Sequence, residues 1–263
     1  MDPASGDETK SDDPALHELA PTSRFTDRAA DYVKYRPAYP ALAIDAVLEG
    51  MGEPSRLVAA DVGAGTGIAS RQLADRGVRV EAVEPNPAMR EAASPHGSVE
   101  WSEGSAEATR LPGASVDVVL CAQAFHWFRP HESLAEFHRI LRPGGRLALL
   151  WNSRDRRDPL TLGYIDAIHA VNGEHPAERR EFDPAVLEGE WFTPATLVTF
   201  PHAQDLDREG LVGRAVSASF VPKQGAAFLA LRERLDALFD RHRDARGRVR
   251  MRYVTKLYRA QRR

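Results

Sequence analysis

The segment Val58–Glu84, VAADVGAGTGIASRQLADRGVRVEAVE, decides how this chain folds. It holds a short apolar run ending in Asp61, a glycine-rich turn, a helical stretch and a second apolar run that ends at Glu84. This order predicts one β-α-β unit. The glycines allow a sharp turn and leave space for a ligand beside the main chain. A carboxylate about 20 residues further on can accept hydrogen bonds from a ribose, so the unit is typical of an adenine-nucleoside site.

The spacing of the glycines separates two kinds of nucleoside site. A dinucleotide fingerprint, G-x-G-x-x-G, would place its third glycine at position 68, where this chain has Ile68. The glycines stand instead at Gly63, Gly65 and Gly67. The chain lacks the glycine that dinucleotide-binding folds use for close helix packing, which disfavours a nicotinamide-dependent oxidoreductase.

Composition narrows the class of protein further. A length of 263 residues suits one α/β domain with an added lid, and 43% hydrophobic and 28% charged residues are ordinary values. A net charge of −3 gives no global attraction to nucleic acid or to an anionic membrane. The single cysteine, Cys121, excludes an internal disulfide and an all-cysteine metal site, and we expect no metal. No signal sequence or 18-residue apolar run occurs, so we expect a cytoplasmic protein without a membrane partner.

The domain organisation follows from changes in composition along the chain. Residues 1–22 contain six acidic groups, one lysine and three prolines, which predicts a disordered acidic leader. Residues 23–263 are expected to form a single domain. A small lid is expected from about 23–40, a short helix stopped by prolines, and from 152–190, a charged insertion after a strand.

Between these segments, strands and helices alternate, which predicts a doubly wound parallel sheet. The expected strands cover about 57–62, 78–83, 98–102, 116–121, 146–151, 195–200 and 249–259. The expected helices cover about 41–52, 66–76, 86–93, 131–142, 160–172, 207–216 and 224–243.

Several motifs in chain order resemble class I S-adenosylmethionine-dependent methyltransferases over about residues 25–263, and in particular the small-molecule subgroup that includes trans-aconitate methyltransferases. The motifs are YVKYRPAYP (32–40), ADVGAGTG (60–67), AVEPNPAM (82–89), GSAEATRLP (104–112), CAQAFHWF (121–128), ILRPGGRLALLWN (140–152) and the final VRMRYVTKLYRAQRR (249–263). The resemblance implies a Rossmann-like α/β fold with a seven-stranded, mostly parallel sheet, flanking helices and a small helical lid. It also implies S-adenosyl-L-methionine as the cofactor.

The resemblance assigns roles in cofactor binding. The glycine turn would accommodate the methionyl part, with Asp61 attracting its positive charges, and Glu84 would hold both ribose hydroxyls. Arg36 would pair with the cofactor carboxylate, which a guanidinium matches bidentately. Ser105 stands where the family often has Asp, but a hydroxyl still donates or accepts a hydrogen bond. The expected cofactor-binding residues are Tyr32, Arg36, Asp61, Gly63, Ala64, Gly65, Gly67, Glu84, Pro85, Met89, Ser105, Ala106, Glu107, Ala122 and Gln123.

The segment after the fourth strand is expected to face the methyl acceptor. His126 lies there between aromatic residues, and two interpretations stay open: a general base with a suitable pKa, or a packed structural residue. A carboxylate acceptor is already ionised, in which case His126 would only orient it. The expected acceptor-pocket residues are Tyr35, Tyr39, His126, Trp127, Trp151 and Asn152.

The basic C-terminal segment suggests an alternative partner. Residues 241–263 contain ten Lys and Arg against one acid, Asp244, a composition that can bind RNA phosphates. The alternation of Val249, Met251 and Tyr253 fits instead a strand with a basic solvent face, so no nucleic-acid partner is expected.

The sequence therefore predicts a methyltransferase that moves a methyl group to a small-molecule acceptor. A carboxylate or hydroxyl oxygen is favoured as the nucleophile, with carbon and nitrogen as further possibilities. Two alternatives remain at this stage: a methyltransferase-like scaffold that binds the cofactor without turnover, and a nicotinamide-dependent oxidoreductase. The protein is expected to be a monomer or a homodimer.

Overall fold

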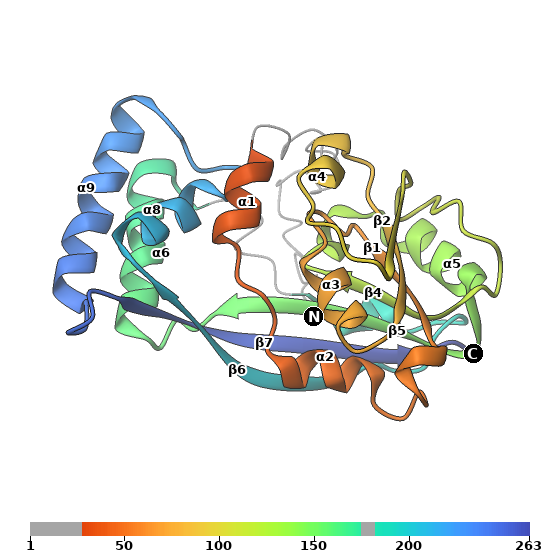
Figure 1. The fold of residues 1–263 in the computed structure, drawn as a ribbon. Coiled ribbons are helices and arrows are strands. Elements are labelled where there is room, and N and C mark those ends of the chain that lie inside the picture. The colour runs from red at the N-terminus through yellow and green to blue at the C-terminus, as the bar shows by residue number, and fades with distance from the viewer. Residues whose placement is uncertain (1–27, 175–181) are drawn as a thin grey trace, which may run out of the picture.

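A seven-stranded sheet forms the centre of the computed structural model, which describes residues 28–174 and 182–263 (Figure 1). Its strand order is β3-β2-β1-β4-β5-β7-β6. Strands β1 to β5 run parallel, and β7 pairs antiparallel with both β5 and β6. The strands are β1 (Val58–Val62), β2 (Arg79–Val83), β3 (Val99–Ser102), β4 (Val116–Ala122), β5 (Leu141–Arg154), β6 (Thr196–Leu206) and β7 (Val249–Gln261). The expected seven-stranded, mostly parallel sheet is confirmed; the predicted leader lies outside the described residues.

Helices follow the strands as the alternating pattern predicted, and the sequence signals at their starts explain where several begin. Asp158 and Asp207 accept hydrogen bonds from the N–H groups of Thr161 and Gly210 and so cap α6 and α8. Proline occupies the first turn of α4, α5 and α6, where its missing N–H costs nothing. The helices are α1 (Ala29–Tyr35), α2 (Ala41–Leu48), α3 (Ile68–Ala74), α4 (Pro87–Glu91), α5 (Pro130–Ile140), α6 (Pro159–Asn172), α8 (Arg208–Val216) and α9 (Gly225–His242), with 3₁₀ turns η3 (Pro54–Arg56), η4 (Phe125–Trp127) and η5 (Pro184–Leu187).

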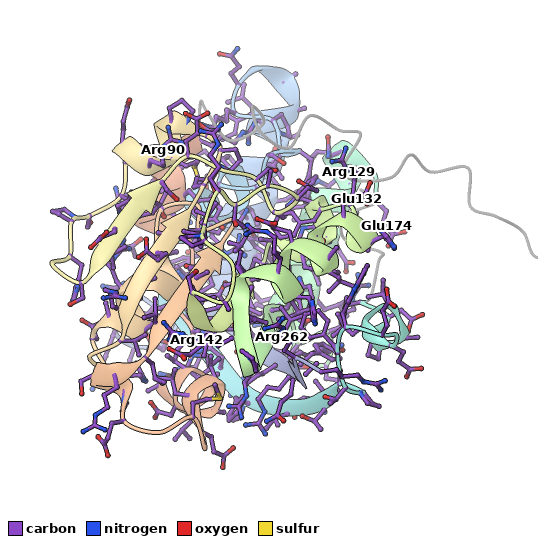
Figure 2. The ribbon with its side chains drawn as sticks, turned by 90° about the vertical axis from the view of Figure 1, so that its right-hand side faces the viewer. Arg90, Arg129, Glu132, Arg142, Glu174 and Arg262 are labelled. Carbon is purple, nitrogen blue, oxygen red and sulfur yellow. The ribbon has the colours of Figure 1, made fainter. Side chains whose placement is uncertain are left out.

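The surface carries charges of both signs, and many of them are paired locally. Figure 2 shows Arg129 beside Glu132 at the start of α5; their charged groups lie 3.3 Å apart. Arg142 donates to Asp117 at 2.6 Å, and Arg262 donates to the carbonyl of Leu141, also at 2.6 Å. Mixed charges of this kind are typical of a solvated surface.

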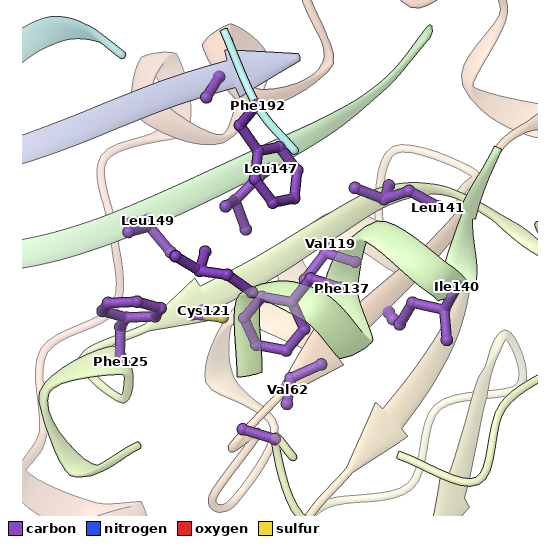
Figure 3. Packing of buried hydrophobic residues seen from close by; sticks show 14 of the residues in the cluster. Val62, Val119, Cys121, Phe125, Phe137, Ile140, Leu141, Leu147, Leu149 and Phe192 are labelled. Carbon is purple, nitrogen blue, oxygen red and sulfur yellow. The ribbon is translucent and has the colours of Figure 1, made fainter. Parts of the chain in front are cut away.

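Helices cover both faces of the sheet, which buries alternate residues of each central strand in different layers. Val62 packs in the layer of α5, whereas Ala59 packs in the layer of α2 and α3. Figure 3 shows Phe137 and Ile140 of α5 against the sheet residue Val119. Strand β4 is buried on both faces, as its nearly continuous apolar sequence predicted.

Strands β5 and β6 are longer than the sequence indicated. Strand β5 starts at Leu141, opposite Val116, and its pairing resumes at Arg146 opposite Val118, so the Pro-Gly-Gly turn forms an irregularity within the strand. Strand β6 continues to Leu206 because the long antiparallel strand β7 supplies a partner as far as Val249. The polar residues at the end of β6 gave no local sign of this pairing.

A second group of helices stands beside the sheet and forms a helical cap, defined here as α1, α6, α8 and α9. Helices α6, α8 and α9 share one apolar cluster with the ends of β6 and β7, and α1 packs on α8 (Figure 1). Helices α1 and α6 fall within the expected lid segments, but the sequence did not assign α8 and α9 to the lid. Part of the 152–190 segment lies outside the described residues, and the division into leader, domain and lid stays a prediction.

One glycine fixes the approach of α1 to α8. A Cβ atom at Gly213 would overlap the ring of Tyr35, so the ring lies directly on the helix backbone. Tyr35 also accepts a hydrogen bond from the Gln204 side chain at its carbonyl oxygen, at 3.0 Å. Tyr35 therefore anchors α1 to the rest of the helical cap.

We predict that Gly213→Ala lowers the free energy of unfolding by about 1–3 kcal/mol, because the added methyl overpacks this contact. The melting temperature should fall by several degrees in a thermal scan. Gly189→Ala is the control, since a Cβ there meets nothing within 4 Å. Equal melting temperatures for the two variants would contradict the packing of Tyr35 on α8.

Candidate active site at the carboxyl ends of the strands

The glycine turn after β1 is held against the end of β2 by its own backbone. The N–H groups of Gly63 and Ala64 both donate to the carbonyl of Val83, at 2.9 and 3.2 Å. Gly63, Gly65 and Gly67 all have positive φ, between 59° and 74°, which L side chains rarely adopt. The turn thus keeps three small residues at the carboxyl ends of β1 and β2.

Glu84 lies at the end of β2 beside this turn, as the sequence predicted. Its Oε2 accepts from the N–H of Gly65 and its Oε1 from the N–H of Asn86, both at 2.9 Å. Burial raises the pKa of Glu84, while these two backbone donors lower it. A carboxylate offers about four acceptor positions, so capacity remains for the hydroxyls of a ligand.

Asp61 is fully buried at the end of β1 and is only partly satisfied. Its Oδ2 accepts from the hydroxyl of Ser70 at 2.6 Å, while Oδ1 has no hydrogen-bond partner among the described residues. Burial raises the pKa of Asp61 to about 6; the Ser70 hydrogen bond opposes this rise and the charge of Glu84 adds to it. A buried carboxylate with a free oxygen is suited to a cationic ligand group.

The residues expected near the adenine occupy a tight turn after β3 and the start of α4. Ser105 and Ala108 exchange backbone hydrogen bonds of 3.2 Å, which places the buried Ala106 inside the turn. Glu107 accepts from the N–H of Arg129 at 3.0 Å and so connects this turn to α5. Met89 is buried, and its Cε lies 3.3 Å from where a Cβ on Gly65 would stand. Pro85 is half-buried between these groups.

The residues after β4 adopt a constrained backbone. Gln123 has a φ of 59°, although it is not glycine. Its N–H donates to Leu150 at 2.8 Å, and its side chain donates to the carbonyl of Asn152 at 3.3 Å. Ala122, just before it, is half-buried. The carboxyl end of β4 is thus held against β5 by hydrogen bonds.

His126 follows in η4, and a neighbouring indole determines its tautomer. Trp151 donates its indole N–H to His126 Nδ1 at 3.3 Å, so the neutral imidazole carries its proton on Nε2. Burial, with the charge of Arg36, lowers the pKa of His126 to about 4. Trp127 packs beside the imidazole with its ring centroid 5.0 Å away. At neutral pH His126 is therefore an uncharged donor at Nε2.

Three other acceptor candidates make structural contacts. Trp151 stacks on Phe182 with centroids 4.8 Å apart. Asn152 donates to the carbonyl of Ala38 at 3.1 Å and accepts from Thr255 at 2.6 Å. Tyr39 is buried, and burial raises its pKa well above the usual value. Their roles toward an acceptor stay predictions.

Tyr32 lies on α1, and Arg36 is the residue directly after this helix. The guanidinium of Arg36 stacks over the ring of Tyr32, 4.7 Å from its centroid, and donates to the carbonyl of Ser217 at 3.1 Å. The Nε of Arg36 is buried and has no hydrogen-bond partner among the described residues. Burial, together with the charge of Arg214, lowers the pKa of Arg36 to about 10.

The structure adds residues that the motifs did not single out. Trp101 covers Gly67, where a Cβ would stand 2.8 Å from the indole, and Ala124 covers Gly63 at 2.7 Å. Ser70 lies on α3 and reaches back to Asp61. Of these residues, only Ser70 could have been identified from the sequence, because it follows Asp61 by nine residues in the helix after the turn.

The described part of the chain contains neither a metal-ion cluster nor a membrane-spanning helix. No group of three or more His, Cys, Asp or Glu side chains in residues 28–174 and 182–263 is placed to hold a metal ion. Within the same residues, no helix combines the length and hydrophobicity needed to cross a bilayer.

Comparisons with known proteins agree with this geometry. Residues 60–149 match the family described as a methyltransferase domain. An uncharacterized methyltransferase of Mycobacterium tuberculosis (strain H37Rv) is 41% identical over 152 residues, which cover 57% of this chain and 58% of that protein. An uncharacterized methyltransferase-like protein of Schizosaccharomyces pombe is 32% identical over 205 residues, 76% of this chain and 78% of that protein.

A solved structure shows the same fold over most of the chain. A putative type II methyltransferase from Anaeromyxobacter dehalogenans superposes with a TM-score of 0.59 and 25% identity, covering 87% of this chain and 97% of that one. The chain belongs to the class I S-adenosylmethionine-dependent methyltransferase family. The match spans little more than half of the mycobacterial relative's length.

We predict that Asp61→Asn raises the free energy of unfolding by up to about 3 kcal/mol near pH 8, because it removes a buried charge. The folded-state pKa of about 6 lies above the ordinary 3.8, so the folded carboxylate is penalised above pH 6. This penalty is lost as the pH falls from about 6 to about 4, and the gain should shrink over the same range. Denaturant unfolding at several pH values measures it.

The matched control for this prediction is Asp205→Asn. Asp205 is exposed and pairs with Arg250 at 2.7 Å, which lowers its pKa, so its removal should bring no gain at any pH. A destabilised Asp61→Asn at pH 8 would show that the Asp61 carboxylate supports the fold.

Proposed function

We propose that this chain transfers the methyl group of S-adenosyl-L-methionine to a small-molecule acceptor, with a carboxylate or hydroxyl oxygen as the favoured nucleophile. The observation that carries the proposal is the pair of buried carboxylates, Asp61 and Glu84, on adjoining strands beside a turn of left-handed glycines.

The residues present fit this cofactor. Asp61 Oδ1 and the hydroxyl of Thr66 are both buried without a partner among the described residues, so the turn offers unused acceptors. Gly65 has a φ of 59°, which favours glycine, and a Cβ there would stand 3.3 Å from Met89 Cε. Glu84 would hold the ribose, Asp61 the positive charge, and Arg36 the cofactor carboxylate.

The chemistry needs alignment more than proton transfer. When bound, the cofactor supplies a methyl group on positively charged sulfur, so the acceptor forms one bond while the sulfur–carbon bond breaks and its electrons return to sulfur. The glycine turn and Glu84 orient one partner, and Trp127 and Trp151 exclude water around His126. Alignment in a dry site provides most of the rate enhancement that such a reaction requires.

His126 would act as an oriented donor in this site. Its Nδ1 accepts from Trp151, which leaves the Nε2 proton to donate to an oxygen of the acceptor. A carboxylate acceptor, as in the trans-aconitate methyltransferases that the motifs resemble, is already ionised and needs no base. An acceptor hydroxyl would need one, and the low pKa of His126, about 4, makes this imidazole a weak base.

We predict that Glu84→Ala weakens binding of S-adenosylhomocysteine at least about tenfold in calorimetry, because charge-assisted hydrogen bonds to the ribose are lost. Glu103→Ala removes an exposed carboxylate from the same side of the sheet and should leave the affinity unchanged. An unchanged dissociation constant for folded Glu84→Ala would refute the assignment. Release of S-adenosylhomocysteine with a panel of small acceptors then separates an enzyme from a binding scaffold.

For His126 we predict a flat kcat/KM from about pH 6 to pH 8, because the imidazole stays neutral across that range. His126→Asn should raise KM by up to about tenfold and leave kcat nearly unchanged. If His126 acted as a general base, His126→Asn would lose about 10²–10⁴ in kcat, and the limb of the pH profile would lie near the pKa of this imidazole, about 4. Trp151→Phe tests the tautomer, since it removes the indole donor and keeps an aromatic ring.

A further inference from the structure

A buried arginine inside the helical cap, Arg214, takes no part in the cofactor site described above. Arg214 on α8 is 4% exposed. Its Nε donates to the hydroxyl of Tyr253 at 3.3 Å and its Nη1 to the hydroxyl of Ser217 at 3.5 Å. Both partners are uncharged. Because Arg36 donates to the carbonyl of the same Ser217, the two guanidinium groups lie close together.

A tyrosine hydroxyl without a partner borders the same group. Tyr164 on α6 is fully buried, and its hydroxyl makes no hydrogen bond to the described residues. Arg154 lies over its ring, 5.0 Å from the centroid. Burial raises the pKa of Tyr164, and Arg214 and Arg154 are the charges that most oppose this rise. A buried hydroxyl without a partner among the described residues therefore lies within the electrostatic influence of Arg154 on β5 and Arg214 on α8.

This arrangement is costly unless an anion binds there. A buried cation needs a hydrogen-bonded counter-ion to offset its desolvation. In residues 28–174 and 182–263, neither Arg36 nor Arg214 forms an ion pair with a carboxylate. Exposed arginines nearby do have such partners: Arg250 lies 2.7 Å from Asp205. Arg146, which is also buried, donates to the backbone carbonyls of Val47 and Glu49, whereas the acceptors of the Arg214 side chain are two neutral hydroxyl groups.

The position of these groups separates them from the cofactor turn. Helices α6 and α8 lie on one side of α1, and α3 and α4 lie on the other (Figure 1). The carboxylates of Asp61 and Glu84 belong to the side of α3 and α4. Arg36 follows α1, between the two sides, and is assigned above to the cofactor carboxylate. Arg214 and the Tyr164 hydroxyl are left for a second anion.

We propose that Arg214 and Tyr164 bind a carboxylate of the acceptor, which anchors the acceptor in the helical cap and is distinct from the atom that receives the methyl group. The acceptor is then a small molecule with at least one carboxylate remote from its nucleophile, such as a dicarboxylate. This assignment rests on the proposed function. The guanidinium provides parallel donors for both carboxylate oxygens, and the phenol adds a third.

The test measures binding of glutarate by calorimetry to protein saturated with S-adenosylhomocysteine, with the uncharged dimethyl glutarate for comparison. The unaltered protein should bind glutarate and not the diester. Arg214→Gln and Tyr164→Phe should each weaken glutarate binding about tenfold or more. Arg250→Gln removes an exposed guanidinium from β7 and should leave it unchanged.

Tyr164→Phe is the sharper variant, because the hydroxyl that it removes has no partner in the fold. Its melting temperature should equal that of the unaltered protein, so weaker glutarate binding could not come from unfolding. Both variants should keep their affinity for S-adenosylhomocysteine. If the unaltered protein did not bind S-adenosylhomocysteine, the proposed function would be refuted.

Three results would overturn the anchoring site alone, with binding of S-adenosylhomocysteine intact. The first is no binding of glutarate or of tricarballylate at millimolar concentration. The second is equal glutarate affinity in Tyr164→Phe and the unaltered protein. The third is binding of inorganic pyrophosphate without binding of either carboxylate, which would assign the arginines to phosphate.

Discussion

The hydrogen bond from the Gly65 N–H to Glu84 connects the two strands on which the rest of the site depends. It is 2.9 Å long and joins the turn after β1 to the end of β2, while the N–H of Asn86 holds the other carboxylate oxygen. Each oxygen thus has a fixed donor before any ligand binds. A carboxylate oriented in this way would lose little side-chain entropy on binding the proposed ribose, because its rotamer is already set.

Beside the same turn, Asp61 is buried with only one of its two carboxylate oxygens hydrogen-bonded within the described residues. Ser70 satisfies one of its oxygens, yet the other has no partner in the described structure. An unsatisfied buried carboxylate is a cost to the folded state, and such costs concentrate at functional sites. The carboxylate of Glu84 on the adjoining strand increases the cost further. Binding of a positively charged group would relieve both effects.

Most of the fold could be predicted from the sequence because local patterns determine it. The apolar run of β4, the capping residues Asp158 and Asp207 and the glycines of the turn each act over a few residues. The full length of β6 could not be predicted, since its last residues pair only because β7 lies beside them. Long-range pairing of this kind overrides local propensity.

In the candidate site, too, some residues could be predicted from local sequence and others could not. Asp61 and Glu84 follow from strand ends and spacing, whereas the Trp151 indole that determines the tautomer of His126 comes from another strand, β5. Arg214 and Tyr164 lie on helices whose sequences show only amphipathic patterns, and nothing local shows that both side chains are buried inside the helical cap. Side chains that meet only through the packing of the helical cap leave no motif.

Buried charges of opposite sign lie on the two sides of α1. Negative charge is buried at the glycine turn, in Asp61 and Glu84, and positive charge is buried across α1, in Arg36 and Arg214. His126 follows β4 and is uncharged at neutral pH, because burial and the charge of Arg36 lower its pKa. A cationic methyl donor and an anionic acceptor would each lower the energy of the side that they contact. Such reactants would be held in separate parts of the site, with the neutral His126 between them, where a charged residue would hinder the approach of one reactant.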